Sequence, residues 1–143
     1  MQELHGYYLE DLEVGMSASY AKTISESDVY MFAGVSGDNN PVHINEDYAS
    51  TTPFKKRIVH GMFSAALIST VAGTRLPGPG AIYIDQQIKF RRPVYIGDTA
   101  KASVTVTAVD EKRSRITAQT DVHVGDTLVA TGNATFLVNK RDA

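Results

Sequence analysis

The segment from Val59 to Leu76 constrains the fold more than any other part of the chain. It combines small and apolar residues on nearly every side and contains no aspartate or glutamate. Because a surface helix carries a polar face, we expect a helix of this composition to be buried all round. Pro77 and Gly78 then end the helix. The rest of the chain must therefore supply elements that enclose it.

The chain after Gly80 alternates apolar and polar residues with a period of two, which is typical of half-buried strands. Gly125 and Asp126 fit a two-residue hairpin turn. One helix followed by an antiparallel meander predicts a single α+β domain over residues 1–143, with the sheet wrapped around the helix. The residues expected to face the core are Ile82, Ile84, Ile88 and Phe90, then Val104, Val106 and Ala108, then Ile116, Ala118, Val122 and Val124, and finally Leu128, Ala130, Ala134 and Phe136.

The first part of the chain predicts a strand and a capped helix. Residues 15–23 are expected to form the strand. Ser25 and Asp28 fit a capping box at the start of the helix, since apolar residues follow at helical spacing. Gly34 and Gly37 are expected to end this helix.

Composition excludes several classes of protein. The chain has no cysteine, so a disulfide scaffold, a thiolate nucleophile and a cysteine-ligated metal are all excluded. The net charge of -2 argues against a nucleic-acid partner. Residues 1–5 do not resemble a signal peptide, and no run approaches the about 20 apolar residues of a membrane span. We therefore expect a cytoplasmic, soluble protein without a membrane partner.

The densest group of reactive and turn-forming residues occupies positions 36–43. It overlaps the stretch of residues 38–53, which looks irregular apart from a short helical turn from Asn45. Pro41 interrupts any helix between Asp38 and His43, and the glycine and asparagines permit unusual backbone angles. Such a loop can turn a carboxylate and an imidazole toward one water molecule and activate it. The residues alone leave open a plainer alternative, in which the loop merely caps a turn. The group reads Ser36-Gly37-Asp38-Asn39-Asn40-Pro41-Val42-His43.

The pattern extends well beyond this loop. Its core resembles the Ser-Gly-Asp-x-Asn-Pro-x-His signature of the MaoC-like, or type 2 enoyl-CoA hydratase, family, with Ala49 six residues after His43. The resemblance covers residues 15–138 and is strongest to the short hydratases that supply polyhydroxyalkanoate synthesis. Further matching blocks follow in the same order, namely Ile58-Val59-His60-Gly61-Met62, Leu76-Pro77-Gly78-Pro79-Gly80, Phe90-Arg91-Arg92-Pro93-Val94 and Gly97-Asp98.

This resemblance implies a hotdog fold, a homodimer, and R-specific hydration of a trans-2-enoyl-CoA thioester. It implies that Asp38 and His43 form the catalytic pair and that Asn40 supports their loop. Gly61, at the start of the buried helix, would donate its backbone N–H to the thioester carbonyl oxygen, where unpaired amides and the helix dipole stabilise negative charge. Ser69, farther along the helix, would line the acyl pocket or contact the water. No cofactor is implied, because coenzyme A is part of the substrate.

Other functions remain open at this point. A 3-hydroxyacyl-ACP dehydratase would run the same reaction in reverse on a carrier-protein substrate. An acyl-CoA thioesterase would share the fold, but such enzymes often place a carboxylate on the central helix, and residues 59–76 have none. A non-catalytic thioester-binding subunit would not need both Asp38 and His43.

His60 also lies in one of the matching blocks. We expect His60 to cap or pack the start of the helix rather than to act as a base. No grouping of histidine, aspartate and glutamate has the spacing of metal ligands, so no metal is expected. The basic runs at residues 55–57 and 89–92 are usual for solvated faces, although they could meet coenzyme A phosphates. Residues 82–90 are a candidate for the dimer contact.

Overall fold

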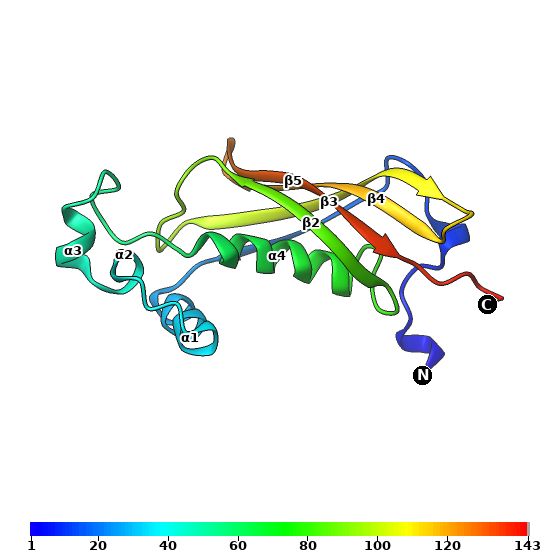
Figure 1. Ribbon diagram of the computed structural model, residues 1–143, viewed down its shortest axis with the longest axis horizontal. Helices are drawn as coiled ribbons and strands as arrows, with labels where there is room; N and C mark the ends of the chain where they lie inside the picture. Colours follow the sequence, from blue (N-terminus) through cyan, green and yellow to red (C-terminus); the bar gives the residue numbers. More distant parts are fainter. Residues whose placement is uncertain (143) are drawn as a thin grey trace.

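The computed structural model describes residues 1–142. Among these residues, no helix combines the length and apolar character needed to cross a membrane. Short 3-10 turns at Gln2–Leu4 and Leu9–Asp11 precede the main elements. These elements are β1 (Ser17–Thr23), α1 (Glu26–Ser36), α2 (Pro41–Ile44), α3 (Glu46–Ser50), α4 (Gly61–Thr74), β2 (Ile82–Phe90), β3 (Thr99–Asp110), β4 (Arg115–Val124) and β5 (Thr127–Leu137) (Figure 1).

The strands of residues 1–142 form one five-stranded antiparallel sheet in the order β1-β3-β4-β5-β2. Helix α4 lies along one face of this sheet, and α1, α2 and α3 gather beyond its N-terminal end (Figure 1). Leu67, Ile68 and Val71 of α4 belong to a core that also contains buried valines and alanines of β3, β4 and β5. The structure therefore confirms the predicted α+β architecture of one long helix and an antiparallel sheet. It corrects the predicted meander in one respect: β3, β4 and β5 follow one another, but β2 pairs with β5 rather than with β3.

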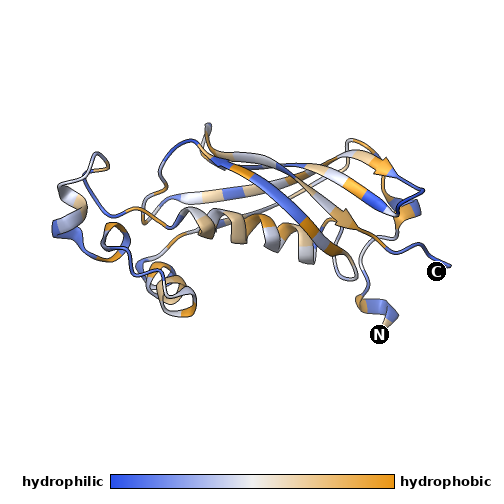
Figure 2. Cartoon of the chain, in the orientation of Figure 1, coloured by the Kyte–Doolittle hydropathy of each residue, from blue (hydrophilic) through white to orange (hydrophobic). Residues whose placement is uncertain are grey.

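Helix α4 is buried on one side only, which corrects the expectation that it is buried all round. Figure 2 shows no strongly hydrophilic residue along α4, because the helix contains only small, apolar and hydroxyl-bearing residues. One sheet can cover only one side of a helix, so the opposite side of α4 is open although it carries no charged residue. Its exposed residues recur every three or four positions and therefore share one face. The residues on this face are Met62, Ala66, Ser69 and Gly73, and the terminal residues Gly61 and Thr74 of α4 are exposed as well.

A bulge in β2 corrects the predicted orientation of its first residues. The register with β5 shifts between Tyr83 and Asp85, and a shift of one residue sends the preceding side chains to the opposite face. Tyr83 consequently packs on the core side together with Ile88. Ile82 and Ile84, which were predicted to share the face of Ile88, are exposed, and so is Phe90 at the end of the strand, which was predicted to face the core.

Two further bulges have the same effect in β3 and β5. In β3 the register shifts between Val106 and Ala108, so Ala108 is exposed and Val109 packs against the core. In β5 the shift buries Val129, whereas Leu128 pairs with His123 and is only half-buried. The remaining inward positions that were predicted in β4 and β5 are confirmed, as is the Gly-Asp hairpin turn between them.

Helix α1 begins as predicted. The Ser25 side chain accepts a hydrogen bond from the Asp28 N–H, and the Asp28 carboxylate accepts one from the Ser25 N–H. Gly34 lies inside the helix, which corrects the expectation that it helps to end it. The helix ends at Gly37, whose φ of 80° belongs to the left-handed region that favours glycine. Beyond it, Asn45 caps α3 as expected, while α2 was not predicted.

Gly132 of β5 tests how closely β5 packs against the edge strand β2. A Cβ atom at this position would lie 1.8 Å from the Gln87 carbonyl oxygen of β2, so the strands would have to move apart. We expect Gly132→Ala to lower the free energy of unfolding in urea by about 1–3 kcal/mol. Gly34→Ala is the matched control, because nothing lies within 4 Å of its added methyl group and α1 gains about 0.5–1 kcal/mol. Equal stability of the two variants would contradict this packing.

Candidate active site

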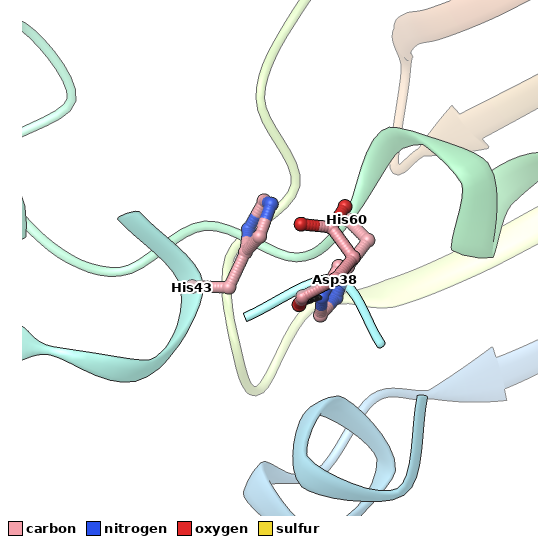
Figure 3. A group of neighbouring side chains, drawn as sticks. All are labelled: Asp38, His43 and His60. Atoms are coloured by element: carbon pink, nitrogen blue, oxygen red, sulfur yellow. Dashed lines mark hydrogen bonds between the residues drawn. The ribbon is translucent and has the colours of Figure 1, made fainter. Parts of the chain in front are cut away.

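Asp38, His43 and His60 converge beside the N-terminal end of α4 (Figure 3). Asp38 follows α1, His43 lies in α2, and His60 directly precedes α4. One side-chain nitrogen or oxygen atom from each residue lies within 4.8 Å of the others. The structure thus brings the predicted pair Asp38 and His43 together, and it adds a third residue to which the sequence assigned only a packing role.

The loop between α1 and α2 holds Asp38 by local hydrogen bonds. Its N–H donates to the Ser36 Oγ atom at 3.1 Å, and its carboxylate accepts from the Asn40 N–H at 3.3 Å. The Asn40 side chain accepts in turn from the Val42 N–H at 3.1 Å and caps α2, with Pro41 as the first residue of that helix. Asn40 therefore braces the loop from both sides, consistent with its predicted supporting role.

His43 is buried, with 7% of its surface exposed, and its ring orientation is set by one hydrogen bond. Its Nδ1 atom lies 2.7 Å from the Ile58 carbonyl oxygen. Since a carbonyl oxygen can only accept, Nδ1 carries the hydrogen and Nε2 has a free lone pair. Burial lowers the pKa of His43, against the opposing effects of the Ile58 carbonyl and the Asp38 carboxylate. The imidazole is therefore neutral at pH 7 and can accept a proton.

His60 is buried even more deeply, with 2% of its surface exposed. Its Nε2–H donates to the backbone carbonyl of Asp38 at 3.0 Å, and its ring stacks on that of His43 with centroids 3.8 Å apart. The prediction that His60 packs at the start of α4 is confirmed, but its side chain does not cap the helix. Sequence spacing could not reveal these contacts, because His60 lies 22 positions beyond Asp38.

Gly61 is the first residue of α4, and its backbone N–H has no hydrogen-bond partner among residues 1–142, whereas the Phe63 N–H of the same turn donates to the His60 carbonyl at 3.0 Å. A cavity of about 220 Å³ lies beside it, with an apolar wall that includes Phe54, Val94 and Val129. A Cβ atom on residue 61 would lie 3.1–3.3 Å from the Phe90 ring, which is tighter than ordinary packing. Glycine at this position therefore allows the Phe90 ring to pack against the start of α4 beside the cavity.

Ser69 does not reach the Asp38–His43 pair along the helix. It lies eight residues beyond Gly61, or about 12 Å at the rise of an α-helix. Ser69 lies on the exposed face of α4, where it lines a separate hollow of about 410 Å³ with Phe32, Met62 and Tyr83. Of the two roles predicted for Ser69, lining an acyl pocket fits this position better than contact with the catalytic water.

The predicted basic runs differ in their surroundings. Arg57 forms ion pairs with Glu26 of α1 at 2.7 Å and with Glu46 of α3 at 3.0 Å, so it joins these helices rather than facing solvent. Arg91 and Arg92, in contrast, line the cavity beside Gly61. Arg91 and Arg92 are therefore placed to meet a charged ligand near the start of α4, whereas Arg57 is already paired.

The cluster of Asp38, His43 and His60 has the donor atoms of a metal site, although no such grouping was apparent from sequence spacing. The two rings are nevertheless stacked with an angle of 27° between their planes. Nitrogen lone pairs lie in the plane of an imidazole, so nearly parallel stacked rings do not direct them at a common ion. This geometry favours acid–base chemistry over metal binding, and the absence of a metal remains a prediction.

A family model described as a MaoC like domain matches residues 11–128 of the chain. The chain belongs to the MaoC-like family. It is 57% identical over 135 residues to the (R)-specific enoyl-CoA hydratase of Rhodospirillum rubrum, covering 94% of each protein. It is 47% identical over 142 residues to the 3-hydroxybutyryl-CoA dehydratase of Methylorubrum extorquens, covering 99% of this chain and 90% of the relative.

The structure of this MaoC-like protein is similar to that of the (R)-hydratase of A. caviae, which is involved in PHA biosynthesis. The TM-score is 0.87 and the identity 40%, over 90% of this chain and 98% of the other. This similarity confirms the predicted hotdog fold. The residues matched by the family model include the loop that carries Asp38 and His43 and the helix start at Gly61.

The lowered pKa of His43 predicts how its charge depends on pH. Burial disfavours the imidazolium, so we expect His43 to stay neutral below the ordinary histidine pKa of 6.5 and to gain a proton only as the pH falls further. The titration is followed by NMR of the ring signals, which are assigned with a His43→Gln variant. A midpoint at or above 6.5 for His43 would contradict this account of its environment.

Proposed function

We propose that this protein adds water reversibly to trans-2-enoyl-CoA to give R-3-hydroxyacyl-CoA, with Asp38 and His43 as its catalytic pair. The observation that carries this proposal is a carboxylate and a neutral imidazole that meet beside the open N-terminal turn of α4. The high identity to an (R)-specific enoyl-CoA hydratase supports the substrate and the product configuration. The protein is thus a hydro-lyase, and it needs no cofactor because coenzyme A enters as part of the substrate.

The proposed mechanism follows from these positions. The Gly61 N–H donates to the thioester carbonyl oxygen, and the dipole of α4 stabilises the negative charge that develops there. This polarisation makes C3 of the enoyl group electron-poor. A water molecule held by Asp38 and His43 attacks C3 while the free Nε2 of His43 accepts a proton from it. A proton then passes from the pair to C2, which returns both residues to their starting state.

In this proposal, the two hollows near α4 bind different parts of the substrate. The cavity beside Gly61 is mostly apolar, with Arg91 and Arg92 at its wall. It suits the thioester arm, because guanidinium groups can meet phosphates farther along coenzyme A. The hollow beside Ser69 lies on the open face of α4 and suits the acyl chain.

We also propose that two copies of the chain form a homodimer through the open face of α4 and the adjoining part of β2. This face exposes Met62 and Ala66, and the hollow on it includes Tyr83 and Ile88 of β2. An exposed face without charged residues on a helix of this length is unusual for a monomer. The contact would include part of the predicted segment 82–90 and would place the thioester near the subunit boundary. The cytoplasmic location expected from the sequence remains a prediction.

Hydration is expected to depend on the carboxylate of Asp38. With crotonyl-CoA as substrate, the wild-type protein should remove the enoyl absorbance, and Asp38→Asn should lower kcat by at least ~100-fold, the usual scale for removal of an acid–base group. Asp110→Asn is the matched control, because Asp110 ends β3 at its turn into β4, at the opposite end of the sheet from the start of α4 (Figure 1), and it should keep full activity. A fully active Asp38→Asn variant would refute the catalytic pair.

The same assay discriminates the alternative functions. A 3-hydroxyacyl-ACP dehydratase would prefer the carrier-protein thioester to crotonyl-CoA at equal concentration. A thioesterase would release free coenzyme A, which a thiol reagent detects. A non-catalytic subunit would leave the absorbance unchanged with either substrate. We expect consumption of crotonyl-CoA without release of thiol.

The proposed interface predicts the effect of a charge on the open face of α4. Ala66→Arg should convert a dimer to a monomer in sedimentation velocity at micromolar concentration, because the arginine would be buried without a partner. Ala108→Arg is the control, since Ala108 is exposed on the opposite face of the sheet and should leave the dimer intact. Far-UV circular dichroism verifies that both variants are folded. A folded Ala66→Arg dimer would place the interface elsewhere.

A further inference from the structure

The backbone of Asp38 is tied to the rest of the protein by one residue that is distant in sequence. Among the other hydrogen bonds of the described residues, Asp38 bonds only to Ser36, the last residue of α1, and to Asn40 of its own loop, each two positions away in sequence. The remaining bond joins its carbonyl oxygen to the Nε2–H of His60 at 3.0 Å. The local bonds define the shape of the loop, whereas the bond to His60 defines where the loop lies relative to α4.

The ring of His60 is itself held from several sides. It stacks on His43 of α2 and contacts the ring of Phe32 of α1 at a centroid distance of 4.8 Å. Phe32 also contacts Phe63 on the first turn of α4 at 5.7 Å. His60 therefore occupies a fixed position among α1, α2 and α4, and its bond to Asp38 cannot shift without a change in this packing.

The Nδ1 atom of His60 shows that packing alone does not explain a histidine here. This atom is buried and has no hydrogen-bond partner among residues 1–142. A buried polar atom without a partner costs free energy, and a phenylalanine would fill the same aromatic position without that cost. What a phenylalanine lacks is the Nε2–H donor. The useful property of His60 is therefore its hydrogen bond to the carbonyl of Asp38.

We infer that His60 is a positioning residue that fixes the catalytic carboxylate of Asp38 relative to the backbone amide of Gly61. His60 connects Asp38 to Gly61. Its side chain donates a hydrogen bond to the Asp38 carbonyl, and the backbone of His60 continues directly into Gly61. In the proposed mechanism, water is held at Asp38 and the thioester oxygen at Gly61. This connection therefore determines whether water and C3 meet at reacting distance, and the inference rests on the proposed catalytic pair.

Two substitutions separate the donor from the ring. His60→Phe keeps the stacking on His43 and removes the N–H, whereas His60→Gln keeps an N–H near the position of Nε2 and removes the ring. Because a displacement of about 1 Å can cost ~100-fold in rate, we expect His60→Phe to lower kcat for crotonyl-CoA by at least ~10-fold, with KM within ~3-fold of the wild type. His60→Gln should recover part of this loss. A His60→Phe enzyme with full kcat would overturn the inference.

A double-mutant cycle with Asp38→Asn tests whether His60 acts through Asp38. If it does, His60→Phe should have less than ~2-fold effect on kcat once the Asp38 carboxylate is gone, because residues that act as a unit are not additive. If His60→Phe instead lowers kcat equally in both backgrounds, its role is general packing and the inference fails. If Asp38→Asn alone leaves kcat unchanged, the proposed catalytic pair fails first, so the two failures are distinguishable.

His5→Phe is the matched control for the chemical change. His5 also stacks on an aromatic ring, that of Tyr8, and its Nδ1 lies 2.9 Å from a backbone carbonyl, that of Gly6. It lies outside the cluster of Asp38, His43 and His60, so its replacement should leave kcat unchanged. Thermal unfolding of all variants is measured in parallel. A kcat loss that tracks the loss of stability across both His→Phe variants would overturn the positioning role of His60.

Discussion

The packing of one face of α4 against the sheet is the constraint on which the rest of the structure depends. Leu67, Ile68 and Val71 fill the concave side of β3, β4 and β5, and this contact determines where the N-terminal turn of the helix lies. That turn begins at Gly61, directly after His60. A backbone amide and a buried imidazole are thereby presented at the end of the sheet, where the loop between α1 and α2 closes over them.

The cluster at this position combines features that each depend on burial. His43 is neutral at pH 7 because its ring is largely removed from water, and its tautomer is set by the Ile58 carbonyl. His60 can order the loop because the stacked rings leave it no alternative orientation. The carboxylate of Asp38, in contrast, belongs to an exposed residue and remains accessible to water. A solvent-accessible carboxylate beside a buried imidazole can activate a water molecule.

The sequence predicted the strands and most of the helices, but it did not predict which side chains of each strand face the core. Period-two alternation identified β2 to β5, and the capping box identified the start of α1. The bulges in β2, β3 and β5 could not be foreseen, because each depends on how a strand twists against its neighbour. For the same reason Ile82 and Ile84 were assigned to the core. The composition of α4 indicated that both sides of the helix lack charged residues, but not that the chain's own sheet covers only one side.

The sequence by itself determined the family, the reactive loop and the residue types in it, because these depend on a short continuous pattern around Asp38, Asn40 and His43. The position of Gly61 at a helix start also followed, since glycine and the apolar run are adjacent in sequence. Only the tertiary structure decided that His60 joins this group and that Ser69 lies apart from it. Contacts across 22 positions depend on how α1, α2 and α4 pack, and local sequence does not encode such distances.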